Sequence, residues 1–73
     1  MALSLKQVRY FIATADTGQV SQAGITLNVS QSAITAAIKQ LEESLGVELF
    51  QRQPTGVALT AEGARFLQHA RNI

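Results

Sequence analysis

Apolar residues recur at helical spacing near the start of the chain. Between positions 5 and 16 they fall every three or four residues, which places them along one side of a helix. Ser4 followed by Gln7 has the pattern of a capping box, in which each side chain bonds the backbone N–H of the other residue. Gly18 is a typical helix stop. We therefore expect a first helix over Leu5–Asp16.

A narrower apolar stripe lies in the middle of the chain, at positions 34, 38, 41 and 45. At 100° per residue these positions share one side of a helix. Ser30 precedes the stripe as a typical N-cap, and Gly46 follows it as a typical C-terminal stop. We expect a helix over about Gln31–Leu45.

A shorter helix signal lies between these two segments. Ser21 is a candidate N-cap, and Ala23, Gly24 and Leu27 follow it in the expected helix. Asn28 then stands where the chain must turn sharply, and asparagine tolerates the left-handed backbone conformation better than most residues. The short helix, the turn and the middle helix together predict a helix-turn-helix pair.

The last third of the chain predicts a hairpin and a final helix. Val47–Phe50 and Val57–Leu59 are rich in β-branched and aromatic residues, and the Gln51–Gly56 segment between them contains the proline and glycine typical of a turn. Thr60 is the next candidate N-cap, with Glu62 in the first turn of the helix. This helix has no stop signal before the sequence ends.

These elements predict a mainly α fold, a winged helix-turn-helix with a three-helix core, a short two-stranded wing and a C-terminal helix. Residues 1–59 would form the winged domain, and residues 60–73 would begin the last helix. The apolar residues expected to form one core are Leu5, Phe11, Ile12, Val20, Ala23, Leu27, Val29, Ile34, Ile38, Leu41, Leu45, Leu49, Phe50 and Leu59.

Composition narrows the class of protein. Of the 73 residues, 47% are hydrophobic and 15% are charged, which is typical of one small globular domain. The absence of cysteine excludes disulfides and thiolate metal sites. No apolar run is long enough to span a membrane and no signal-peptide pattern is present, so we expect the protein inside the cell. The net charge of +1 is weak evidence for or against a nucleic-acid partner.

No group of residues has the pattern of a catalytic or metal site, so we expect neither enzyme activity nor a cofactor. His69 is the only histidine, whereas a metal site needs three or four ligands. Glu42 and Glu43 are adjacent, so on a helix their carboxylates point in different directions. Glu42 is expected to support packing against the wing or to pair with a basic residue. Arg52 has two interpretations: a phosphate contact, or an ion pair with a carboxylate such as Glu42.

The side of the middle helix opposite its apolar stripe carries small, uncharged, hydrogen-bonding groups. Gln31, Ser32 and Thr35 lie toward its N-terminal end, and Ala36 and Lys39 follow. If this end entered a DNA major groove, the amide and hydroxyls would reach base edges, and the methyl groups of Thr35 and Ala36 could contact thymine. Lys39 suits a phosphate. On an isolated helix this would more often be a solvated polar face, but the upstream helix and tight turn favour DNA recognition.

An ordered set of residues extends through essentially the whole chain without gaps. Its members are Leu5, Phe11, Ser21-Gln22-Ala23, Leu27, Val29-Ser30-Gln31-Ser32-Ala33-Ile34-Thr35, Ile38, Leu41-Glu42, Leu45-Gly46, Leu49-Phe50, Arg52 and Leu59-Thr60-Ala61-Glu62-Gly63. In these residues the chain resembles the N-terminal winged helix-turn-helix domain of LysR-type transcriptional regulators. The resemblance implies a bacterial, cytoplasmic regulator that binds double-stranded DNA as a dimer or a dimer of dimers.

The resemblance also implies roles for particular residues. The family's base-contact positions correspond to Gln31, Ser32, Thr35 and Ala36. Between Gly18 and Gln40 the only charged residue is Lys39, so hydroxyls, amides and helix N-termini must supply most phosphate contacts there. The residues expected at the DNA backbone are Ser21, Gln22, Ser30, Lys39, Arg52 and Thr55, with Arg52 and the wing near phosphate or the minor groove.

Four features depart from the family pattern. Ser32 stands where many members have proline, Ala36 stands where many have arginine, and the wing tip lacks the usual basic residues. These three features change what is recognised and how tightly. Gly24 replaces a frequent alanine, which costs about 1 kcal/mol of helix propensity unless close packing leaves no room for a side chain.

The resemblance makes the C-terminal helix a linker helix that pairs with a second copy, before an effector-binding domain that this chain lacks and that would bind any small-molecule effector. A two-fold dimer would present two recognition helices to an inverted repeat. The residues expected at the dimer contact are Ala64, Phe66, Leu67, Ala70 and Ile73. The alternative function is a winged helix that serves only as a protein-interaction or dimerisation module. An apolar or masked outer face on the middle helix would favour that alternative.

Overall fold

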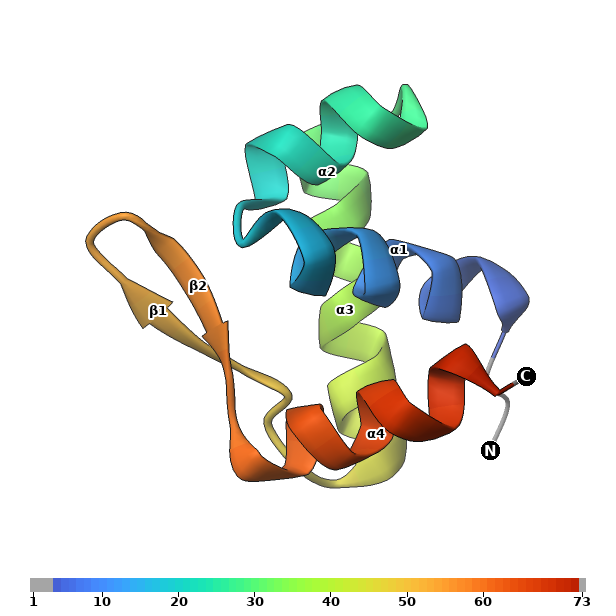
Figure 1. Ribbon diagram of the computed structural model, residues 1–73. Helices are drawn as coiled ribbons and strands as arrows, with labels where there is room; N and C mark the ends of the chain where they lie inside the picture. The colour runs from blue at the N-terminus through green and yellow to red at the C-terminus, as the bar shows by residue number, and fades with distance from the viewer. Residues whose placement is uncertain (1–3, 73) are drawn as a thin grey trace.

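The computed structural model describes residues 4–72 as four helices and a two-stranded antiparallel hairpin (Figure 1). The elements in order are α1 (Leu5–Thr17), α2 (Val20–Leu27), α3 (Gln31–Leu45), β1 (Phe50–Gln53), β2 (Gly56–Leu59) and α4 (Ala61–Arg71). In Figure 1, α3 passes behind α1, and the hairpin extends away from the helices as a wing. The predicted mainly α, winged helix-turn-helix fold is confirmed.

Local capping explains where three of the helices begin. Ser4 forms a capping box in which both reciprocal bonds are present. The side chains of Ser30 and Thr60 each accept a hydrogen bond from the backbone N–H three residues later, at 3.1 and 2.9 Å. Gly18 and Gly46 end α1 and α3 in the left-handed conformation, with φ of 73° and 72°. The predicted caps and stops of these helices are therefore confirmed.

The prediction that Ser21 caps α2 is wrong. The helix begins at Val20, and its N-cap is Gln19, which is extended with φ of −146° and makes no side-chain cap bond. Gly18 ends α1 in the left-handed conformation, and the single extended residue Gln19 separates it from α2. Ser21 consequently lies inside the first turn of α2.

The turn between α2 and α3 depends on a close backbone approach. Asn28 adopts the predicted left-handed conformation with φ of 58°. The next N–H, that of Val29, donates to the carbonyl oxygen of Gly24 at 2.9 Å. A Cβ built at Gly24 would lie only 2.8 Å from the Val29 carbonyl oxygen. Glycine at this position lowers the helix propensity of α2, but it leaves room for the backbone of the turn, which comes closest to α2 here.

The first strand begins later than the predicted Val47–Phe50, and the turn is shorter than the predicted Gln51–Gly56. The N–H of Leu49 donates to a Glu42 carboxylate oxygen at 2.7 Å, and its carbonyl accepts from Thr60 N at 3.0 Å. The N–H of Leu49 is thus bonded to α3, and only its carbonyl bonds the residue opposite it in the hairpin. Strand pairing continues until Gln53 lies opposite Gly56, which leaves a two-residue turn.

Phe11 occupies the centre of the core. It is fully buried, and its ring lies 5.3 Å from that of Phe50 in β1 and 5.2 Å from that of Phe66 in α4, measured between centroids. Leu41 and Leu49 are buried with it, and a second cluster is formed by Ala23, Ile34 and Ile38. Leu5, predicted to be in the core, is 66% exposed because the first residue of α1 lies at the edge of this packing.

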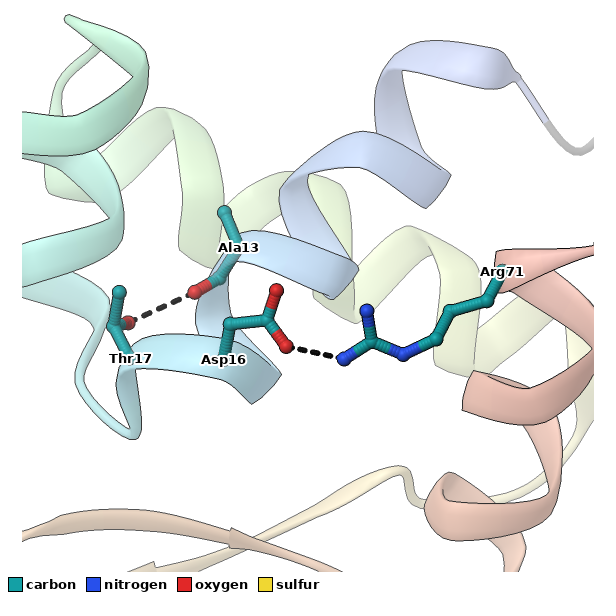
Figure 2. Close-up of polar contacts among 4 residues, drawn as sticks. All are labelled: Ala13, Asp16, Thr17 and Arg71. Atoms are coloured by element: carbon teal, nitrogen blue, oxygen red, sulfur yellow. Dashed lines mark hydrogen bonds and ion pairs between the residues drawn. The ribbon is translucent and has the colours of Figure 1, made fainter.

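The far end of α4 is joined to the end of α1 by a surface contact. The Arg71 guanidinium forms an ion pair with the Asp16 carboxylate, while the neighbouring Thr17 hydroxyl bonds the carbonyl of Ala13 (Figure 2). It is the only ion pair within residues 4–72. Both partners are about half exposed, so the pair contributes at most about 1 kcal/mol. The buried aromatic contact therefore has the larger part in holding α4.

A substitution at Gly63 tests how tightly α4 packs on the base of the wing. In an isolated helix, glycine to alanine stabilises by about 1 kcal/mol. Here a Cβ would lie 2.1 Å from the carbonyl oxygen of Leu49. We expect Gly63→Ala to lower the free energy of unfolding by about 1–3 kcal/mol in urea denaturation, because backbone must move. An increase in stability would contradict this close approach.

Glu42 tests the connection between α3 and the wing. Glu42→Ala leaves the part-buried N–H of Leu49 without its acceptor, and we expect a loss of about 1–3 kcal/mol in the free energy of unfolding. The matched control is Glu43→Ala, an exposed neighbour on the same helix, which should change stability by less than about 0.5 kcal/mol. Equal losses in the two variants would assign the effect to charge or helix propensity.

Candidate nucleic-acid interface

The outer face of α3 is polar and open. All five residues predicted to face outward, Gln31, Ser32, Thr35, Ala36 and Lys39, are exposed. The apolar stripe on the other side of the helix is buried at Ile34 and Leu41, and nearly so at Ile38. The predicted division of the helix into a core side and an outer side is therefore confirmed.

An open groove of about 930 Å³ separates this face from the wing. Gln31, Thr35 and Lys39 line it from α3, Ser21 lines it from α2, and Arg52 lines it from β1. The wing projects beside α3 in Figure 1, so one concave surface includes the helix and the hairpin. Five of the predicted contact residues are thus brought together.

Two cations and two carboxylates line the groove. Lys39 and Arg52 are exposed, and neither has an ion-pair partner among residues 4–72. Glu42 is partly buried, and its carboxylate bonds the N–H groups of Leu49 and Phe50. The interpretation of Glu42 as a support for the wing is confirmed, whereas the ion pair between Arg52 and Glu42 does not form. Arg52 is left with its guanidinium available to an anion.

The remaining predicted contact residues do not line this groove. Ser32 and Ala36 lie on α3 outside its lining, and Gln22 and Thr55 are exposed on α2 and at the wing turn. Ser30 lines a smaller hollow of about 540 Å³ beside the turn between α2 and α3. Its hydroxyl caps α3 and lies 3.2 Å from that of Ser32. These hydroxyls lie next to the start of α3.

Sequence reasoning missed three glutamines that line the groove, Gln19, Gln51 and Gln53. The sequence predicts a turn at Gln51 and Gln53, whereas both belong to β1. A strand of four residues is too short for its alternation to be recognised before the ends are known. Gln19 was overlooked because Ser21 has the more typical side chain of an N-cap.

The proposed dimer residues on α4 do not form one free surface. Ala70 is 5% exposed, and Phe66 and Leu67 pack against the core of their own chain. They lie on the side of the helix that covers Phe11, so this side of α4 is already occupied. Ala64 is exposed, and Ile73 lies outside the described residues. If α4 contacts a second copy, its outer side is the side available for that contact.

Within residues 4–72, no three His, Asp or Glu side chains are grouped so that they could hold a metal ion. In that part of the chain, no helix combines the length and the apolar character needed to cross a membrane.

Curated proteins with similar sequences are bacterial regulators. The chain is 46% identical over 71 residues to the HTH-type transcriptional regulator ClcR of Pseudomonas putida, and 45% identical to TfdS of Cupriavidus pinatubonensis. Each alignment covers 97% of this chain and 24% of the relative. The chain therefore spans about a quarter of the length of these relatives.

Solved structures with the same fold include DNA complexes. The DNA-binding domain of CbnR in complex with DNA superposes with a TM-score of 0.93 at 43% identity, covering 96% of this chain and 80% of that one. The BenM domain bound to a catB site gives 0.92 at 33% identity, covering 96% and 79%. A family model for bacterial regulatory helix-turn-helix proteins of the lysR family matches residues 5–64. The chain belongs to the LysR family of bacterial regulatory helix-turn-helix proteins.

Proposed function

We propose that this chain is the sequence-reading DNA-binding domain of a LysR-type transcriptional regulator, with α3 in the major groove of its target. The observation that carries the proposal is the free outer face of α3, which turns amide and hydroxyl groups toward a groove bounded by Arg52. Solved relatives named as DNA complexes support it, since they share both fold and sequence.

Within this proposal the contact residues have separate roles. Gln31, Ser32 and Thr35 approach base edges, where glutamine suits adenine and hydroxyls serve several bases, and Ala36 offers its methyl group to thymine. A further group meets the sugar–phosphate backbone and fixes the position of the helix. That group consists of Ser21, Gln22, Ser30, Lys39, Arg52 and Thr55.

The alternative, a module that only binds proteins, is less well supported. A module that binds only proteins is expected to carry an apolar patch on the outer face of α3. The large hydrophobic residues exposed within the described chain are Leu5, Ile25 and Val47, and none of them belongs to α3. A polar, unobstructed helix face is what DNA recognition requires.

The complete protein is expected to have more parts than this chain. Residues 1–59 would be the DNA-binding domain, and residues 60–73 would begin a linker helix that joins two copies. Relatives are about four times longer, which leaves room for a domain that binds a small-molecule effector. A dimer, or a dimer of dimers, would act in the bacterial cytoplasm.

Selection of bound duplexes from a randomised DNA library tests the base-reading role of α3. We expect a two-fold repeat to be enriched, and Gln31→Ala and Thr35→Ala to relax particular positions of it at about 1–3 kcal/mol per lost base contact. The matched control is Gln40→Ala, which removes another exposed side chain of α3 that does not line the groove. Selection of no sequence even at low salt would favour the protein-interaction alternative.

Light scattering at high protein concentration tests the dimer. If the outer side of α4 joins two copies, the mass should double with concentration, and Ala64→Glu should prevent this because two carboxylates would approach each other at a two-fold contact. Urea denaturation of Ala64→Glu checks that the domain still folds. A monomer at every concentration would contradict dimerisation through this segment.

A further inference from the structure

The wing rests on the turn between α1 and α2. The N–H of Val57 donates to the carbonyl oxygen of Gly18 at 2.9 Å. Gly56, with φ of 146°, lies so close that a Cβ there would be 2.2 Å from the same oxygen and 3.1 Å from Cγ of Gln19. A hairpin with two four-residue strands is marginal by itself. Its position therefore depends on this contact with the helices.

Gln19 extends the contact to the tip of the wing. Its side-chain Nε2 donates to the carbonyl oxygen of Thr55 at 3.1 Å, across 36 positions of sequence. Its Oε1 lies 3.5 Å from the Ser21 hydroxyl oxygen, at the limit of a hydrogen bond. One side chain thus connects the first turn of α2 to the two-residue turn of the hairpin.

The Gln19 side chain bonds the wing instead of capping the helix that follows it. Gln19 is the N-cap of α2, yet its side chain makes no cap bond. Serine, threonine, asparagine and aspartate are strongly preferred at an N-cap because they bond the free N–H groups of the first turn. A residue selected for the stability of α2 would be one of these. Glutamine is long enough to reach the wing instead.

We propose that Gln19 is a positioning residue, which holds the wing at the distance from α3 that DNA binding requires. The proposal rests on the proposed DNA-binding function. With the bond to Thr55 made, the wing and Arg52 stay beside the groove before DNA arrives. Without it, the wing samples other positions, and the apparent affinity falls in proportion to the competent fraction.

Gln19→Met provides the test, because methionine keeps the length and the packing of the side chain but cannot donate to Thr55. In the free protein, we expect the amide hydrogen of Val57 to exchange about two- to tenfold faster. On a selected duplex, we expect the dissociation constant to rise about two- to fivefold, less than the exchange rate, because the competent fraction falls by less than the factor by which opening increases. The melting temperature should stay within about 3 °C of the wild type, since one exposed hydrogen bond is lost.

Two further variants separate positioning from stability. Gln40→Met is the matched control, because it too removes an exposed bond between distant residues, the one from Gln7 at 3.2 Å, without touching the wing. It should leave Val57 exchange and affinity unchanged. Gln19→Ser supplies a good cap to α2 and should raise the melting temperature by about 4–8 °C while DNA binding still weakens.

Each of these measurements has a result that would overturn the proposal. Unchanged Val57 exchange in Gln19→Met would mean that the side chain does not hold the wing, and any loss of affinity would then reflect a direct contact with DNA. Faster exchange with unchanged affinity would mean that the wing position is not limiting. If the wild type binds no duplex, the proposed function fails, but the exchange measurement still decides whether Gln19 holds the wing.

Discussion

The rest of the structure depends on the burial of Phe11. Its ring touches Phe50 at the base of the wing and Phe66 in α4, so one side chain joins elements that are distant in sequence. Removing a buried phenylalanine typically costs about 3–5 kcal/mol, against a total stability of about 5–15 kcal/mol for a small domain. Because α3 packs its stripe against the same core through Leu41, this packing also determines that its polar side faces outward.

Periodicity and caps were enough to predict α1, α3 and α4, because these elements depend on nearby residues. The predicted start of α2 was wrong at a local cap, whereas the predicted start of β1 was wrong because a distant group decides it. β1 starts at Phe50 because the carboxylate of Glu42, on another element, takes the N–H of Leu49. The open face of α3 could be predicted in the same way as its buried face. The position of the wing, which forms the opposite wall of the groove, could not be predicted. It depends on the contact of the wing with Gly18, which is distant in sequence.

The candidate interface carries little charge. Lys39 and Arg52 are the cations that line the groove, and the carboxylates of Glu42 and Glu48 line it too. Affinity for DNA that relies on few cations depends on accurate placement of neutral donors, because hydrogen bonds are directional whereas Coulomb attraction is not. The tight turn at Asn28 and the contact of the wing with Gly18 supply that placement.

Two close contacts between elements are made by backbone atoms, the approach of Gly24 to Val29 and that of Gly56 to Gly18. The side chains on the outer face of α3 take no part in these contacts. Residues at positions 31, 32, 35 and 36 can therefore be exchanged without repacking the interior. Under the proposed base contacts, substitution at these surface positions alone would change the DNA target while the fold stays the same.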